Sequence, residues 1–227
     1  MKELPPIILI DKPSGMTSFD VIRTLRKKTG IRKFGHAGTL DPLATGLMIL
    51  GVQEGTKQLT NFIKLDKEYI AEIRLGESHT TDDLEGEITE EVEVATTFTD
   101  DTINKIVTTL IGTVTLPVSA YSAIKKDGVP LYKKARKAAE QGTVFTDVPM
   151  RDMVVYEAEL LSHAPLVIDG KKRYVVTVRF AVASGVYIRS LGREFGKRMR
   201  YPATLQSLRR TKVGDFDIKD AKTLDEF

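Results

Sequence analysis

The chain contains no cysteine among its 227 residues. It therefore cannot form disulfides, use a thiolate nucleophile or bind metal through cysteine, which fits the reducing cytoplasm where we expect it to work. Its histidines, His36, His79 and His163, do not follow a metal-binding spacing, so we expect no transition metal. Apolar runs fall short of the ~20 residues of a membrane span, and the one near the N-terminus is too short for a signal peptide, so we expect no membrane association.

Acidic and basic residues are separated along the chain. The stretch from Glu77 to Asp101 holds ten acidic residues and no lysine or arginine. Basic residues gather in three clusters, at 23–33, 125–137 and 189–212. This separation favours a face that binds a polyanion such as nucleic acid, with the acidic stretch directed away from it.

The hydrophobic pattern predicts an α+β fold in one domain spanning 1–227. Strands and helices do not alternate regularly enough for a doubly wound sheet, so a mixed, largely antiparallel β-sheet flanked by helices is expected. We expect a helix with Ser18 as N-cap and Gly30 as its stop, an Asp-Gly turn at Asp127-Gly128 and a hairpin turn at Asp169-Gly170. The other expected strands are 7–10, 47–52, 67–76, 86–94, 154–162, 173–182 and 209–218, and the other expected helices are 56–63, 103–111, 130–142 and 187–199.

One short stretch, FGHAGTLDPLATGLM at 34–48, holds a single charged side chain, Asp41. Pro42 restricts Asp41 to extended backbone. Glycines around it leave the main chain open to another molecule. An isolated Asp-Pro is most often a surface turn, so this stretch alone does not distinguish a turn from a reactive site.

The stretch GHAGTLDPLATGLM is similar to the signature of TruB-type tRNA pseudouridine synthases. Three more stretches follow in that family's order, DKPSGMTS, YSAIKKDGVPLYKKAR and GVYIRSLGREFG. The KEY at 67–69 and the TTDDLEG at 80–86 also resemble family features, and the resemblance runs from about Ile8 to Phe216.

The resemblance implies a pseudouridine-synthase-like fold and the isomerisation of the T-loop uridine at tRNA position 55. Substrate and product are isomers, so no cofactor or metal is expected. The resemblance makes Asp41 the nucleophile or base at the sugar. It pairs Arg189 with Asp41, which keeps the carboxylate ionised, and it makes Tyr69 the residue that stacks on the uracil. Asp83 matches an acidic position that supports the site.

The resemblance also implies an RNA-binding face. The target nucleotide must be extruded from its stack, and contacts to the RNA backbone can offset that cost. The segment at about 115–150 corresponds to an RNA-gripping insertion. The expected RNA contacts are His36, Lys12, Gly38, Thr39, Tyr121, Lys125, Tyr132, Arg136, Tyr187, Leu208 and Arg209.

The sequence departs from the family pattern in three places. Ser184 and Val186 replace a lysine and a threonine, TLPVSA replaces a glutamine and paired prolines, and the chain stops at Phe227, before a separate C-terminal RNA-binding domain. We therefore expect tRNA binding weaker than in longer relatives, with catalysis intact. The expected partner is the T-arm of tRNA, bound by a monomer without an obligate protein partner.

Three alternatives remain open. The first is a pseudouridine synthase that depends on a guide RNA. The second is a module that binds or folds tRNA without catalysis. The third is a hydrolase with paired carboxylates, which needs a second acid ~5–9 Å from Asp41, and the local sequence offers no candidate.

Overall fold

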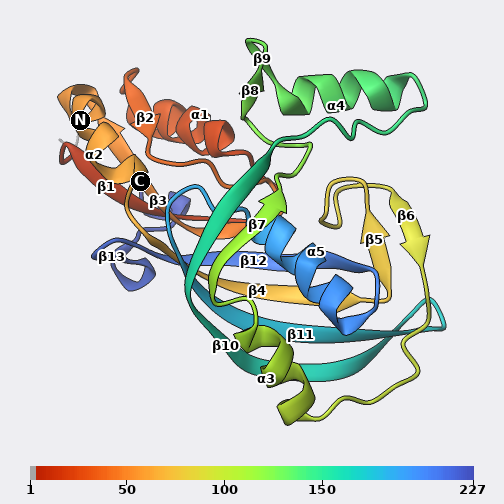
Figure 1. Cartoon of the computed structure of the whole chain (residues 1–227). Helices are drawn as coiled ribbons and strands as arrows, with labels where there is room; N and C mark the ends of the chain where they lie inside the picture. Colours follow the sequence, from red (N-terminus) through yellow and green to blue (C-terminus); the bar gives the residue numbers. More distant parts are fainter. Residues whose placement is uncertain (1–3) are drawn as a thin grey trace. The chain divides into compact units, whose positions relative to one another are not determined.

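The computed structural model describes residues 4–227 (Figure 1). The chain divides into two compact units. The first unit holds the described residues up to Ile70, together with Arg179–Gly185 and Ser207–Phe227. The second holds Ala71–Val178 and Val186–Gln206. Each of three strands has residues in both units: β4 (Lys67–Leu75), β11 (Lys171–Val182) and β12 (Ala203–Val213).

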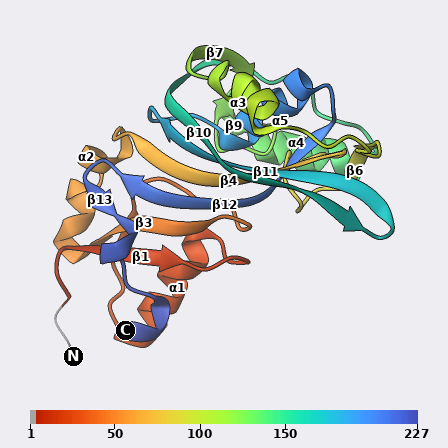
Figure 2. The ribbon, with the colours of Figure 1, turned by 90° about the horizontal axis from the view of Figure 1, so that it is seen from below.

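In the first unit, the strand that follows Asp41 is an inner strand of the sheet, with a neighbouring strand on each side (Figure 2). This strand, β3 (Thr45–Val52), pairs antiparallel with β1 (Ile7–Lys12) and β2 (Phe34–His36), and parallel with β12. The hydrogen-bonded order is β1-β3-β12-β4-β11, and β13 (Phe216–Asp217) pairs with β12. Seven of the eight residues of β3 are buried, as expected of a strand covered on both faces. Short helical elements complete the unit: η1 (Gln53–Gln58), α2 (Thr60–Ile63), η2 (Ile218–Asp220) and η3 (Leu224–Glu226).

The first long helix, α1 (Ser18–Thr29), begins one residue earlier than the sequence predicts. Thr17, not Ser18, is the N-cap, and it forms a capping box with Asp20. The Ser18 side chain turns inward instead, and its hydroxyl is bonded to the backbone of Leu40. Gly30 ends the helix in the left-handed conformation, as predicted.

In the second unit, the hydrogen-bonded order of strands is β12-β4-β11-β10-β7. Here β7 (Gly112–Pro117) pairs antiparallel with β10 (Met150–Ile168). The helices α3 (Asp100–Thr108) and α5 (Ile188–Met199) pack against each other, α3 against β10 and α5 against β7 (Figure 1). A small sheet pairs β5 (Glu77–His79) with β6 (Ile88–Glu91), and another pairs β8 (Lys125–Lys126) with β9 (Val129–Pro130), just before α4 (Leu131–Glu140).

Turn chemistry and alternation are the features that the sequence predicts best. Asp127 and Gly128 have φ of 55° and 77°, and Asp169 and Gly170 have φ of 49° and 75°. These left-handed pairs are the two-residue turns expected of Asp-Gly hairpins. In β4 the residues alternate between buried and half-buried, as predicted, with Tyr69 on the buried side.

Several predicted element boundaries are wrong. The strand expected at 209–218 starts at Ala203, the strand expected at 86–94 shrinks to Ile88–Glu91, and the helix expected at 56–63 divides into η1 and α2. The hairpin strand expected at 154–162 extends over Met150–Ile168. No helix in residues 4–227 is both long enough and apolar enough to span a membrane.

Candidate active site

Asp41 lies in a loop, here called the Asp41 loop (residues 37–44), that connects β2 to β3. Asp41 is half-buried, and its carbonyl accepts a hydrogen bond from the Ala44 amide at 3.1 Å. On one side of it, the Ser18 hydroxyl is bonded to both the amide and the carbonyl of Leu40, at 2.9 and 3.1 Å. On the other side, the Pro42 carbonyl accepts from the Gly15 amide at 2.9 Å. The N-terminal segment therefore holds the backbone on both sides of Asp41.

A buried lysine braces the same loop. The Lys12 side chain is fully buried, and its ammonium donates to the carbonyls of Pro13, Met16 and Pro42 at 2.9, 2.6 and 3.1 Å. These bonds join the loop before α1 to the residue that follows Asp41. The structure thus gives Lys12 a bracing role that the sequence did not predict, and its contact with RNA stays a prediction.

A second buried cation, Arg210, holds the other end of the Asp41 loop. Its guanidinium donates to the carbonyl of Leu47 at 2.7 Å and to the carbonyl of Gly38 at 3.3 Å. Burial lowers the pKa of His36, and the charge of Arg210 lowers it further, which favours the neutral imidazole. The sequence placed Arg210 only in a basic cluster, because nothing local to it signals burial.

Tyr69 is buried on β4, and Lys67, two residues before it, is buried as well. The Lys67 ammonium donates to the carbonyls of Ile63 and Leu65 and to the hydroxyl of Ser184, the last at 3.1 Å. Burial lowers the pKa of Lys67 to about 8, and Arg210 contributes in the same direction. Lys67 thus holds the segment before β4 in place, and Ser184 is one of its partners.

Two further predicted residues lie on β12 in the first unit. Arg209 binds both carboxylate oxygens of Asp11, at 2.7 and 3.1 Å, and also reaches the hydroxyl of Thr45 at 3.3 Å. Leu208 is buried, and its carbonyl accepts from the same hydroxyl at 3.5 Å. Both residues therefore contact the start of β3, a few residues beyond Asp41.

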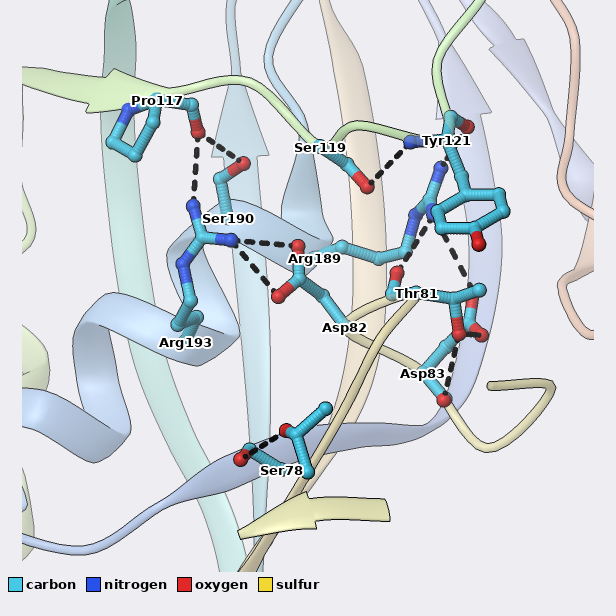
Figure 3. A network of polar contacts seen from close by, with 11 residues as sticks. Ser78, Thr81, Asp82, Asp83, Pro117, Ser119, Tyr121, Arg189, Ser190 and Arg193 are labelled. Atoms are coloured by element: carbon cyan, nitrogen blue, oxygen red, sulfur yellow. Dashed lines mark hydrogen bonds and ion pairs between the residues drawn. The ribbon is translucent and has the colours of Figure 1, made fainter. Parts of the chain in front are cut away.

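Arg189 lies at the start of α5 in the second unit, where it holds two loops (Figure 3). Its guanidinium donates to the carbonyl of Thr81 at 2.8 Å and to that of Tyr121 at 3.1 Å. The Asp83 carboxylate lies 3.7 Å from the same guanidinium, so the structure places Asp83 beside Arg189. Tyr187 directly precedes α5 as its N-cap residue.

The segment at 115–150 carries the three remaining predicted residues on β8 and α4. Lys125 and Arg136 are exposed, and Tyr132 is half-buried. The Arg136 guanidinium lies 5.7 Å from the centre of the Tyr132 ring, in a cation–π contact. This arrangement presents a cation and an aromatic ring on one helix, as expected of a nucleic-acid contact.

The predicted residues divide between the two units. The first unit brings Lys12, His36, Gly38 and the exposed Thr39 to the Asp41 loop, and it also carries Tyr69, Leu208 and Arg209. The second carries Asp83, Tyr121, Lys125, Tyr132, Arg136, Tyr187 and Arg189. The pairing of Asp41 with Arg189 joins residues of different units and stays a prediction. Within residues 4–227, no three histidine or acidic side chains form a group that could hold a metal ion.

Comparison with known proteins gives one consistent result. The family described as "TruB family pseudouridylate synthase (N terminal domain)" matches residues 26–188. The chain is 41% identical over 220 residues to tRNA pseudouridine synthase B of Leifsonia xyli subsp. xyli, covering 96% of this chain and 70% of that protein. It is 40% identical over 216 residues to the protein of the same name from Corynebacterium efficiens, covering 95% and 69%.

A solved structure has a similar fold over nearly the whole of this chain. A chain of the structure described as "Crystal Structure of a Cbf5-Nop10-Gar1 Complex" is 25% identical, with a TM-score of 0.69 over 96% of this chain. This chain spans about half, 52%, of that longer one. The expected fold, a mixed and largely antiparallel sheet flanked by helices, is confirmed. The sequence identity, the family match and the fold agree that the chain belongs to the TruB family of pseudouridylate synthases.

Proposed function

We propose that this chain is a tRNA pseudouridine synthase that isomerises the T-loop uridine at tRNA position 55. The observation that carries the proposal is the Asp41 loop, in which one carboxylate is held between the bonds of Ser18 and those of Lys12. Membership of the pseudouridylate synthase family and relatives named tRNA pseudouridine synthase B support it.

The reaction breaks the N1–C1′ bond of uridine and joins C1′ to C5; C5 loses its proton and N1 gains one, so the product is an isomer of the substrate. Asp41 acts either as a nucleophile at the sugar or as a base that removes a C2′ proton. Either role needs an ionised carboxylate, which a nearby cation favours. We assign that cation to Arg189. Tyr69 stacks on the uracil after the nucleotide leaves its stack.

RNA binding to the first unit is supported by the exposed side of α1. Phe19 is 52% exposed, and the guanidinium groups of Arg23 and Arg26 lie 5.6 and 5.7 Å from its ring. These residues follow Ser18, which is bonded to Leu40 beside Asp41. An aromatic ring with two arginines can stack on a base or contact phosphates.

We further propose that the T-arm of tRNA is the partner, and that the enzyme acts as a monomer in the cytoplasm without an obligate protein partner. Lys125, Tyr132 and Arg136 contact the RNA from the 115–150 segment. A guide-RNA-dependent enzyme is the alternative that the family resemblance leaves open. Turnover of an isolated T-arm hairpin distinguishes the two, because a guide-dependent enzyme does not act on it.

The test uses a T-arm hairpin carrying tritium at C5 of its uridines. The unmodified chain is expected to release tritium and Asp41→Asn is not. Asp225→Asn, in which a 99% exposed carboxylate is neutralised, serves as the control and should match the unmodified chain. Binding without tritium release would contradict catalysis and indicate a binding module. Release of free uracil would indicate a hydrolase.

A further inference from the structure

We propose that Asp82 and Arg193 form a positioning pair that sets Arg189 for catalysis by fixing the two loops which Arg189 holds. The loops are 80–87, which contains Asp82, and 117–122, which lies within the 115–150 segment between β7 and β8. The inference rests on the proposed function, because it assigns Arg189 to catalysis. Asp82 and Arg193 act through Arg189 and are not themselves catalytic residues.

Arg193 binds both loops, through Asp82 in one and Pro117 in the other. One nitrogen of the Arg193 guanidinium donates to both carboxylate oxygens of Asp82, at 2.9 and 2.8 Å (Figure 3). The other terminal nitrogen donates to the carbonyl of Pro117 at 3.0 Å, and that carbonyl also accepts from the Ser190 hydroxyl at 2.9 Å. A single arginine on α5 therefore ties the first loop to the start of the second.

Arg193 lies one helical turn after Arg189, so both arginines project from the same side of α5. They bind neighbouring groups: Arg189 holds the carbonyl of Thr81 and lies beside Asp83, while Arg193 holds Asp82 between them. The second loop is also held at two points, at Pro117 by Arg193 and at Tyr121 by Arg189. Moving either loop would therefore move acceptors of Arg189.

Asp82 is a costly residue for a purely structural turn. Its φ of 62° is left-handed, a conformation that aspartate adopts more readily than most residues, so the cost lies in the burial of its carboxylate and not in its backbone. It is 9% exposed, and burial raises the pKa of its carboxyl even though Arg193 and Arg189 lower it. Asp82 is buried but the Arg193 side chain is 38% exposed, and an ion pair that is partly open to solvent contributes little to stability. We infer that the carboxylate is there to fix Arg193.

The backbone at this point is fixed from a second direction. The Leu205 amide donates to the Asp82 carbonyl at 3.0 Å, and Asp83 forms an isolated β-bridge with Leu205. Asp83 in turn accepts from the Thr81 hydroxyl and from the Glu85 amide. With its main chain held by β12 and its side chain held by α5, Asp82 has one orientation available.

The test compares two arginines of α5 that hold different partners. Arg193→Met removes the donors to Asp82 and Pro117. Arg198→Met is the matched control, because Arg198 binds Glu194 and Thr109 and touches neither loop. In the C5-tritium assay we expect Arg193→Met to lower kcat about 10- to 100-fold with KM for the hairpin changed less than about 3-fold, since a displacement near 1 Å can cost about that much in rate. Arg198→Met is expected to keep kcat within about 2-fold.

A second measurement does not depend on turnover. Amide hydrogen exchange of the unmodified chain, Arg193→Met, Asp82→Asn and Arg198→Met is compared by mass spectrometry. We expect Arg193→Met and Asp82→Asn to speed exchange in both 80–87 and 117–122, and Arg198→Met to leave both loops unchanged. Equal exchange in all four proteins would overturn the pair as a positioning device, as would an Arg193→Met kcat equal to that of Arg198→Met. Absence of turnover in the unmodified chain would instead refute the proposed function, and exchange would still decide on the pair.

Discussion

Replacing Gly46 with alanine tests how closely the strand after Asp41 approaches its parallel neighbour. Gly46 is the second residue of β3 and pairs with Arg210 on β12. A Cβ atom at Gly46 would lie 2.3 Å from the carbonyl oxygen of Arg210 and 2.8 Å from its nitrogen. Ordinary contacts of this kind lie near 3.4 Å or beyond. The two strands would therefore have to separate locally by roughly 1 Å.

The control is Gly112, which has nearly the same φ without the close neighbour. The φ is 105° at Gly46 and 99° at Gly112, and a Cβ at Gly112 would meet no described heavy atom within 4 Å. Backbone strain of ~1–3 kcal/mol is thus expected in both variants. Gly46→Ala adds overpacking of ~1–3 kcal/mol and a weakened backbone hydrogen bond of ~1 kcal/mol.

The measurement is thermal unfolding followed by circular dichroism. The extra loss of ~2–4 kcal/mol in Gly46→Ala corresponds to a Tm roughly 4–16 °C below that of Gly112→Ala, at about 2–4 °C per kcal/mol for a chain of this size. Equal Tm values for the two variants would refute the close-approach argument. They would show that backbone strain alone makes glycine necessary in the GLM part of the Asp41 stretch.

Three other changes test separate features. Thr17→Ala removes the side-chain acceptor at the start of α1 and should lower the free energy of unfolding by ~1 kcal/mol, measured in urea, whereas no loss would contradict the capping role. Replacing Arg23 and Arg26 together with glutamine should weaken binding of the T-arm hairpin. The slope of log binding constant against log salt concentration, measured by fluorescence anisotropy between 50 and 200 mM salt, should fall in magnitude by up to ~2. An unchanged slope would show that this face of α1 does not contact the RNA. The pKa of Lys67 is about 8 in the folded chain, against an ordinary 10.5. Between about pH 8 and 10.5 the unfolded chain therefore holds this proton more strongly than the folded chain does. The free energy of unfolding should contain a component that rises with pH over that range. Lys67→Met should lack that component in pH-dependent urea unfolding, and identical profiles would contradict the shift.

Local features of the fold were predictable because local chemistry decides them. The Asp-Gly turns and the alternation of β4 depend on neighbouring residues alone, and both are confirmed. The N-cap of α1 was misplaced because Thr17 and Ser18 are equally good caps by composition. Their roles diverge only when Leu40, 22 positions after Ser18, comes to bond the Ser18 hydroxyl.

The parts of the site that were missed depend on contacts between distant segments. Arg210 and Arg193 read in the sequence as members of one basic cluster. Arg210 is buried because β12 lies beside β3, and Arg193 is held because α5 faces the loop of Asp82. No local pattern separates such arginines from their exposed neighbours. The sequence therefore pointed to the Asp41 stretch and to its chemistry, but not to the arginines that hold the surrounding loops.

The parallel pairing of β3 with β12 also has a consequence for the order in which the chain folds. β3 ends at Val52, and its partner begins only at Ala203. At synthesis rates of ~5–20 residues per second, roughly 8–30 s pass on the ribosome between the two. Through that interval the apolar strand TGLMILGV lacks one neighbour, and contacts this distant in sequence slow folding. The Asp41 loop therefore acquires its Arg210 bonds only after residue 210 has been made, 169 positions after Asp41 itself.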